Sequence, residues 1–306
     1  MNKDKTILIT GGTGLTGRRL TAFALERGYQ VIVLTQRNTF PKSESPNLRY
    51  AYWNVKNGII DDQAILDADV IIHLAGAGVA DKRWTKNYKK LILTSRVNAT
   101  KTLAEAITRL NNPPSVFVSS SAIGFYGSDG GDAIFTEFSE AGTGFLSNVC
   151  IEWEKQALQA NEFTRVVIGR IGIVLDPREG ALAKMLLPFS MFMGGKIGSG
   201  NQWMSWIHPI DIIGFILHAM SNEHVRGTFN LVAPGAVTMN RFTELLSSIL
   251  HRPSWLHVPD IALSILLGEG AVIATGGQHV LPQRTIESGY RFQYTDCDHT
   301  LRDLLG

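Results

Sequence analysis

The sequence predicts an α/β fold, in which a doubly wound parallel sheet is followed by a smaller, mostly helical C-terminal region. Two observations support this prediction. Apolar strands alternate with helical segments throughout the first half of the chain, and this order builds right-handed βαβ units around a parallel sheet. A glycine-rich string, residues 10–17, connects the first strand to the first helix.

Each element of the first half follows from composition and spacing. The run Gln-Val-Ile-Val-Leu-Thr at 30–35 is apolar and β-branched, as expected of a parallel strand buried on both faces. The helix after the glycine string ends where Gly28 supplies a C-cap signal. By the same criteria, strands are predicted at 6–9, 30–35, 48–53, 69–73, 115–119 and 164–169, and helices at 15–26, 61–66, 85–110 and 148–161.

The second half of the chain no longer alternates strands and helices regularly and is predicted to be mostly helical. Strands are expected at 203–207 and 228–232, and helices at 180–192, 211–220, 241–250, 259–267 and 299–305. The strand at 228–232 is a candidate to rejoin the sheet. Because no internal repeat or low-complexity linker separates the halves, the second half is expected to pack on the first.

The glycine-rich string has the features of a phosphate-binding turn. Glycine lets backbone approach a phosphate closely, and the helix that follows offers free N–H groups and a positive dipole end. Since a strand precedes the string and a helix follows it, it predicts a pyrophosphate site; the alternative is an ordinary glycine-rich strand–helix turn. The predicted contacts are Gly11, Thr13, Gly14, Leu15, Thr16 and Gly17.

The glycine-rich string indicates how the chain divides into domains. Residues 1–178 are predicted to form a Rossmann-type dinucleotide-binding domain, to which residues 208–233 return. Residues 179–207 and 234–306 then form the substrate-side and helical C-terminal region. The ligand should lie outside the carboxyl ends of the strands.

The end of the second strand predicts which dinucleotide binds. An acidic residue there would bind the ribose 2′-OH of NAD and repel a 2′-phosphate. The chain instead has Gln36 and Arg37, and an arginine makes charge-assisted, bidentate contacts to phosphate. NADP (NADPH) is therefore predicted over NAD, with Arg18 and Arg19 as further sources of positive potential. The alternative for Arg37 is a solvated loop arginine.

Composition excludes several classes of function. With 29 Lys+Arg against 27 Asp+Glu, the net charge of +2 predicts no nucleic-acid or membrane partner, and no apolar run approaches the length of a membrane span. The two cysteines, Cys150 and Cys297, match no metal or redox spacing, so no metal site is predicted. The N-terminus leaves no room for a signal peptide before the first strand, which predicts a cytoplasmic protein.

Several strings carry a resemblance to a known family. The opening Thr-Gly-Gly-Thr-Gly-Leu-Thr-Gly and the strand end His-Leu-Ala-Gly at 73–76 resemble the extended short-chain dehydrogenase/reductases, which include nucleotide-sugar epimerases and dehydratases. The strings Lys-Arg-Trp-Thr (82–85), Met-Leu-Leu-Pro-Phe (185–189), Gly-Gly-Lys-Ile-Gly-Ser-Gly (194–200) and Leu-Pro-Gln-Arg (281–284) resemble an atypical branch of uncharacterised "epimerase family" proteins. The similarity spans nearly the whole chain, including a helical C-terminal extension.

The resemblance implies further site residues. Leu74, Ala75 and Gly76 would line the adenosine side of the cofactor. Arg96 resembles a branch residue that reaches the cofactor, although an exposed helix arginine is the alternative. Arg170 follows the sixth strand, near where the nicotinamide lies in relatives. Relatives of this kind are commonly dimers, so a homodimer with a small-molecule substrate is implied.

The catalytic residues of that superfamily are only partly present. It uses a Ser/Thr and a Tyr-x-x-x-Lys pair, in which the lysine lowers the tyrosine pKa. Ser121 matches the serine, with Ser120 as the alternative. Where tyrosine and lysine are expected, this chain has Phe145 and Val149, or Gly144 and Asn148 in the neighbouring register, and neither pair transfers protons.

Tyr126 is the leading substitute for the missing proton donor, because it lies on the loop after the Ser121 strand; a tyrosine that shapes the pocket is the alternative. His208 and Asp211 are also candidates, for which a structural role is favoured. Two functions follow: an NADP-dependent oxidoreductase or epimerase acting on a small carbonyl or sugar-like substrate, or a nucleotide-binding sensor or scaffold without turnover. The polar and aromatic residues between 196 and 208 favour the enzyme.

Overall fold

The computed structural model describes residues 5–37, 39, 40, 43 and 45–306, and its centre is an eight-stranded sheet in the order β13-β8-β6-β5-β1-β2-β3-β4. The neighbouring strands are parallel, except that β4 runs antiparallel to β3. The predicted doubly wound α/β fold is confirmed. The strands are β1 (Thr6–Thr10), β2 (Gln30–Thr35), β3 (Leu48–Asn54), β4 (Ile59–Ile60), β5 (Val70–His73), β6 (Val116–Ala122), β8 (Arg165–Ile171) and β13 (Gly227–Leu231).

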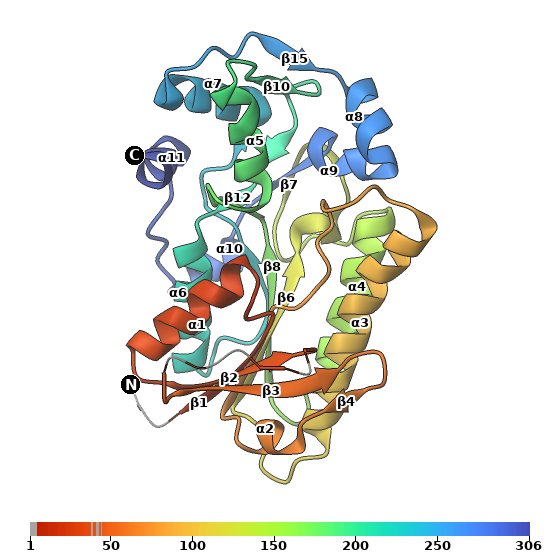
Figure 1. Ribbon diagram of the computed structural model, residues 1–306, viewed down its shortest axis with the longest axis vertical. Helices are drawn as coiled ribbons and strands as arrows, with labels where there is room; N and C mark the ends of the chain where they lie inside the picture. The colour runs from red at the N-terminus through yellow and green to blue at the C-terminus, as the bar shows by residue number, and fades with distance from the viewer. Residues whose placement is uncertain (1–4, 38, 41–42, 44) are drawn as a thin grey trace.

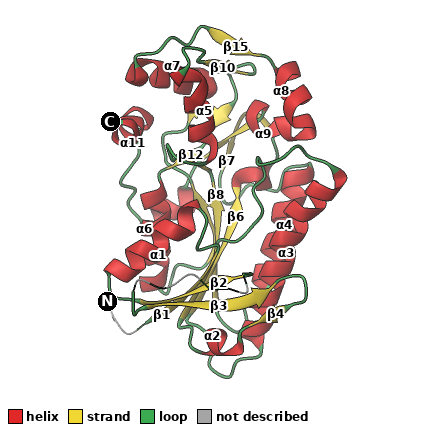
Figure 2. Ribbon diagram, viewed as in Figure 1, coloured by secondary structure: helices red, strands yellow, loops and turns green. Residues whose placement is uncertain are grey.

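Helices cover both faces of this sheet (Figures 1 and 2). On one face lie α1 (Leu15–Glu26) and α6 (Pro209–Ser221), and on the other α2 (Asp62–Leu66), α3 (Lys86–Thr108) and α4 (Phe145–Leu158). Alternate residues of β1 serve the two layers: Ile7 and Ile9 pack with α1 and α6, and Leu8 packs with α3. Burial on both faces explains the unbroken apolar strands, since each fully buried Ile or Leu contributes roughly 1.5–3 kcal/mol.

The upper part of the molecule in Figure 1 is a smaller region with its own apolar core, which includes Phe189, Trp206, Phe242 and Leu301. The predicted strand at 203–207 is two short strands, because its two halves pair with different partners. The helices are α5 (Gly180–Ser190), α7 (Met239–Leu250), α8 (Asp260–Leu267), α9 (Val272–Thr275), α10 (Gln283–Glu287) and α11 (Cys297–Leu305), with short 3-10 turns η1 (Ile123–Tyr126) and η2 (Gly268–Ala271). The two-stranded pairs are β9 (Ile173–Val174) with β12 (Trp206–Ile207), β10 (Gly195–Ile197) with β15 (Leu256–Val258), and β11 (Trp203–Met204) with β14 (Val237–Thr238).

One strand pair that the sequence did not predict joins the two regions. β7 (Asp129–Phe135) runs parallel to β16 (Gly277–Val280). Just beyond β7, the Glu137 carboxylate accepts hydrogen bonds from the backbone N–H of Arg284 at 3.1 Å and of Asn230 at 2.9 Å. The C-terminal segment is therefore built into the edge of the first domain.

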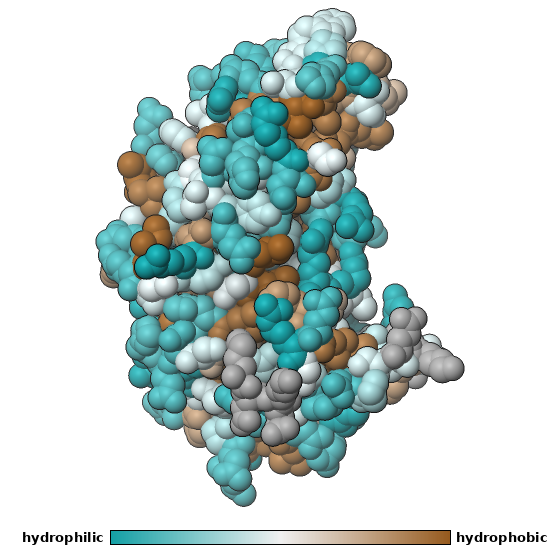
Figure 3. Space-filling view, turned by 90° about the vertical axis from the view of Figure 1, so that its left-hand side faces the viewer, coloured by the Kyte–Doolittle hydropathy of each residue, from teal (hydrophilic) through white to brown (hydrophobic). Residues whose placement is uncertain are grey.

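Exposed apolar surface is unevenly distributed. Figure 3 shows a large apolar area near the upper end of the molecule, whereas the lower half of that face is mostly hydrophilic. Leu187, Met191, Phe192 and Met193, at and just after the end of α5, are among the exposed large apolar side chains.

Candidate functional site

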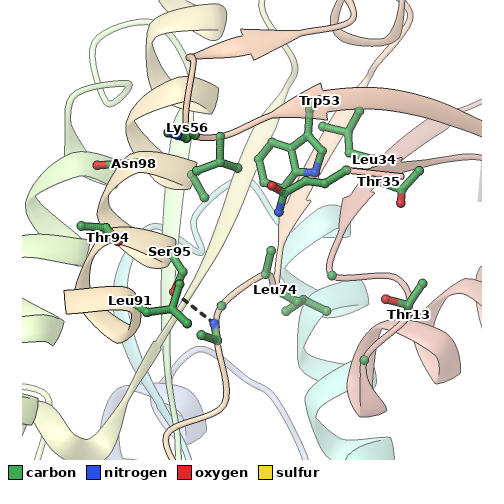
Figure 4. Close-up of a pocket in the computed structure, with 18 of the residues that line it drawn as sticks. Thr13, Leu34, Thr35, Trp53, Lys56, Leu74, Leu91, Thr94, Ser95 and Asn98 are labelled. Atoms are coloured by element: carbon green, nitrogen blue, oxygen red, sulfur yellow. Dashed lines mark hydrogen bonds between the residues drawn. The ribbon is translucent and has the colours of Figure 1, made fainter. Parts of the chain in front are cut away.

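A cleft of about 720 Å³ opens at the carboxyl ends of β1, β2 and β5, where the parallel sheet predicts a ligand. Figure 4 shows Thr13 and Leu74 on one side of it, Trp53 and Lys56 above, and Thr94, Ser95 and Asn98 of α3 opposite. The lining residues are Gly11, Thr13, Gly14, Leu34, Thr35, Gln36, Arg37, Trp53, Val55, Lys56, Leu74, Ala75, Gly76, Ala77, Leu91, Thr94, Ser95, Asn98 and Ala99.

The glycine-rich turn forms one end of this cleft. Gly11 has a φ of 71°, a left-handed conformation that favours glycine. α1 begins at Leu15, directly after the cleft residue Gly14, and no side-chain hydrogen bond caps its first turn, so its first N–H groups are available to a ligand. Leu15, Thr16 and Gly17 belong to the turn but do not line the cleft.

Gly17 has a different role from the glycines that line the cleft. A Cβ on Gly17 would lie 2.1 Å from the Gly11 carbonyl oxygen, so only glycine lets α1 start this close to the end of β1. Gly11 is packed closely as well, since a Cβ there would lie 2.8 Å from the Leu74 carbonyl carbon, but Gly17 has the shortest such contact in the turn.

The opposite end of the cleft is positively charged. Arg37 follows β2 and Lys56 lies in the turn between β3 and β4; both side chains are exposed, and none of the described residues that line the cleft is a carboxylate. Lys56 was missed in the sequence, where it reads as an ordinary lysine in a polar turn. Arg18 and Arg19 do not add free charge, which corrects that prediction: Arg18 pairs with Glu179 and Arg19 with Asp176.

A buried histidine holds the cleft wall at Leu74, Ala75 and Gly76. The Ala75 N–H donates to Thr10 Oγ1 at 3.3 Å, and Thr10 Oγ1 lies 2.6 Å from His73 Nδ1. On the other side His73 Nε2 lies 3.0 Å from Thr100 Oγ1, whose proton goes to the Arg96 carbonyl. Thr100 therefore accepts from Nε2–H, and Nδ1 accepts from Thr10. Burial lowers the pKa of His73 to about 3, so the ring is neutral.

This histidine predicts a pH dependence of stability. The folded pKa of about 3 lies below the unfolded value near 6.5, so the unfolded state binds the extra proton. The contribution is complete above pH 6.5 and is lost as the pH falls toward 3, by roughly 3–5 kcal/mol. His73→Gln should flatten the free energy of unfolding between these pH values in urea titrations. The exposed His299→Gln is the control; equal profiles for both variants would refute the assignment.

Arg96 lies behind the cleft wall rather than in its lining. Its guanidinium packs against Gly76, lies 5.1 Å from the Trp153 ring and donates to the Ile92 carbonyl at 3.0 Å. Burial lowers its pKa, and the described residues give it no ion pair. A contact with the cofactor stays a prediction.

Three other predicted residues meet in one buried network. The Ser121 hydroxyl donates to Glu154 Oε1 at 2.6 Å, and Arg170 donates to both Glu154 oxygens at 2.9 Å. Arg170 Nη1 also donates to the Tyr126 hydroxyl at 3.0 Å, which in turn donates to Asn230 Oδ1 at 2.7 Å. Burial raises the pKa of Tyr126 despite the Arg170 charge. Ser121, Tyr126 and Arg170 do not line the cleft, and their roles toward cofactor or substrate stay predictions.

The positions of the missing Tyr-x-x-x-Lys pair are apolar in the structure as well. Val149 is buried beside Trp84, and the Phe145 ring packs edge-on against Trp84 at 5.1 Å.

His208 and Asp211 make structural contacts: the His208 ring stacks on Tyr294, and Asp211 accepts from the backbone N–H of Gln293 and Tyr294. In the described part of the chain, no group of three or more His, Cys, Asp and Glu side chains is arranged to hold a metal ion.

None of the helices among the described residues is long and apolar enough to span a membrane.

Comparisons with known proteins agree with this geometry. Residues 7–231 match the NAD dependent epimerase/dehydratase family, and residues 258–304 match a domain of unknown function, DUF1731. The chain is 37% identical to epimerase family protein SSP1921 of Staphylococcus saprophyticus, over 98% of this chain and 99% of that protein. It is 38% identical to the chloroplastic SDR39U1 homolog of Arabidopsis thaliana, over 98% and 86% of the two chains.

A solved structure extends this similarity to three dimensions. The crystal structure of human epimerase family protein SDR39U1 (isoform 2) with NADPH superposes with a TM-score of 0.86 at 31% identity and covers 98% of both chains. The glycine turn, the cleft and the family match over most of the sequence lead to one conclusion: the chain belongs to the NAD dependent epimerase/dehydratase family.

Proposed function

We propose that this protein is an NADP(H)-binding oxidoreductase or epimerase that acts on a small carbonyl or sugar-like substrate. One observation carries the choice of cofactor. A cleft that begins at an uncapped helix N-terminus ends at two exposed cations, Arg37 and Lys56, and the described residues of its lining include no carboxylate. The human relative, whose structure was solved with NADPH, supports this choice.

The residues present fit an NADP molecule. The backbone N–H groups at the start of α1 and of the glycine turn, except that of Gly14, which donates to the Gly11 carbonyl at 2.9 Å, would hold the diphosphate. Arg37 and Lys56 would hold the 2′-phosphate, and Leu74 to Gly76 would contact the adenosine. When bound, the nicotinamide supplies or accepts a hydride.

Removing either cation tests the cofactor proposal. Arg37→Gln and Lys56→Gln should each weaken NADPH binding about 10- to 100-fold and leave NADH binding nearly unchanged, because a charge-assisted contact contributes roughly 1.5–3 kcal/mol. Dissociation constants from fluorescence titration measure this.

Arg49→Gln is the matched control, since Arg49 is an exposed arginine of β3 that pairs with Asp67 and does not line the cleft. The proposal fails if wild-type protein binds NADH as tightly as NADPH, or if Arg37→Gln weakens both equally.

The catalytic assignment is a separate step. We propose Tyr126 as proton donor and Ser121 as its partner, supported by their connection through Glu154 and Arg170. A binding protein without turnover is the second candidate, favoured by the apolar Phe145 and Val149 and by the burial of the Tyr126 hydroxyl. Oxidation of NADPH by any member of a broad carbonyl panel would support the enzyme. Because an epimerase regenerates its cofactor, the binding protein is supported only if sugar-like substrates are not epimerised either.

A further inference from the structure

Helix α8 has an unusual environment for its composition. The sequence Asp-Ile-Ala-Leu-Ser-Ile-Leu-Leu is apolar almost all round, yet none of its side chains that the structure describes is buried. Ile261 is 74% exposed and Ile265, one turn later, is 71% exposed. A helix that is apolar all round is normally buried, so this one lacks a partner in the isolated chain.

A cluster of cations lies beside α8. The first turns of α3 and the residues before them carry Lys82, Arg83, Lys86 and Lys90, all exposed. The two segments touch: Arg83 packs against Gly268 at the end of α8, and Lys89 pairs with Glu269 at 2.5 Å. Figure 1 shows α8 directly above the start of α3. We call Ile261, Ile265 and the four exposed cations the α8–α3 surface.

The charge of this surface is positive. Among the described residues, none of the four cations forms an ion pair. Glu269 is occupied by Lys89, which leaves Asp81 and Asp260 as the nearby carboxylates in these segments. The overall charge of +2 does not reveal this cluster, because the four cations lie together within residues 82–90 and are balanced by carboxylates elsewhere in the chain.

We propose that the α8–α3 surface docks the protein on an anionic membrane. Apolar side chains exposed beside a group of lysines and arginines match the acyl boundary and the anionic headgroups of a lipid leaflet. A second copy of this chain fits less well. A two-fold dimer would bring the surface against itself and would gather two sets of the four cations in one interface. The proposal is independent of the cofactor and of turnover.

Vesicle cosedimentation of the full chain tests this docking. The protein should bind vesicles of phosphatidylcholine with phosphatidylserine and should not bind vesicles of phosphatidylcholine alone, and added salt should release it. Lys86→Glu and Lys90→Glu should each weaken binding about fivefold or more. The double variant Ile261→Asp, Ile265→Asp should abolish it, and NADPH affinity should stay at the wild-type value because these residues do not line the cleft.

Two control variants match the test variants. Lys101→Glu changes an exposed lysine later on α3, and Ile59→Asp changes an apolar residue of β4 that is 50% exposed; both should bind vesicles like wild type. Three results would overturn the proposal: no binding to anionic vesicles, equal binding to both vesicle types, or equal losses in control and test variants. Binding to polyglutamate but not to vesicles, lost in the same test variants, would assign the surface to an acidic protein instead.

Discussion

Gly17→Ala should abolish NADPH binding and destabilise the fold by roughly 3 kcal/mol. The added Cβ would lie 2.1 Å from the Gly11 carbonyl oxygen and 2.8 Å from the Gly12 Cα, and these are backbone atoms that cannot rotate away. Relief requires α1 to move off the end of β1, which displaces the N–H groups that face the cleft. Urea unfolding and NADPH titration measure the two effects.

Gly58→Ala provides the comparison. Gly58 lies in the β3–β4 turn with a φ of +65°, and a Cβ there would meet no atom within 4 Å. Only the cost of the left-handed conformation remains, about 1 kcal/mol. If Gly17→Ala were as stable as Gly58→Ala and bound NADPH like wild type, the packing role of Gly17 would be wrong.

The second large effect is expected at the buried ion pair between Glu154 and Arg170. Both side chains are less than 10% exposed, and the contact is bidentate. Arg170→Met should cost about 3–5 kcal/mol of unfolding free energy, because it leaves the Glu154 carboxylate buried with Ser121 as its remaining side-chain donor. Glu154→Leu should cost a similar amount by stranding the guanidinium.

A double-mutant cycle separates the interaction energy of the Glu154–Arg170 pair from the cost of the individual substitutions. Arg170→Met with Glu154→Leu removes both charges together and should be more stable than either single variant, since no unpaired ion remains buried. Strictly additive losses in urea unfolding would show that the two residues do not act as a pair. Loss of Arg170 should also remove the hydrogen bond that the Tyr126 hydroxyl accepts from Nη1 and leave its bond to Asn230 Oδ1.

Local patterns in the sequence were enough to predict most strands of the sheet, the glycine turn at one end of the cleft and Arg37 at the other. Strand β2 was predicted at its observed bounds because burial on both faces leaves a continuous apolar run. The turn from Gly11 to Gly17 and the cation at Arg37 were predicted for a similar reason. The strand, the turn and the position of the cation are each determined by residues close together in the sequence, so they can be predicted from spacing alone.

Features that depend on residues far apart in the sequence could not be predicted. β7 contains two glycines and two aspartates and is a strand only because β16, some 150 positions away, runs beside it. Arg18 and Arg19 read as free cations, but Glu179 and Asp176 approach them from the far side of the fold. Lys56 reaches the cleft through the β3–β4 turn, and nothing in its neighbourhood in the sequence indicates that position.

The pairing of β7 with β16 changes how the two family models should be understood. One ends at residue 231 and the other begins at 258, as though a module had been appended to a finished domain. Yet Asp211 accepts two backbone N–H groups from the later segment, and Glu137 accepts one from Arg284. Cutting the chain between the two models would leave the buried Asp211 carboxylate without these two donors and would leave Glu137 with only its Asn230 contact in the first segment. The segment matched by the second family model thus supplies backbone donors to carboxylates of the segment matched by the first, so the extension forms part of the Rossmann domain's own boundary with solvent.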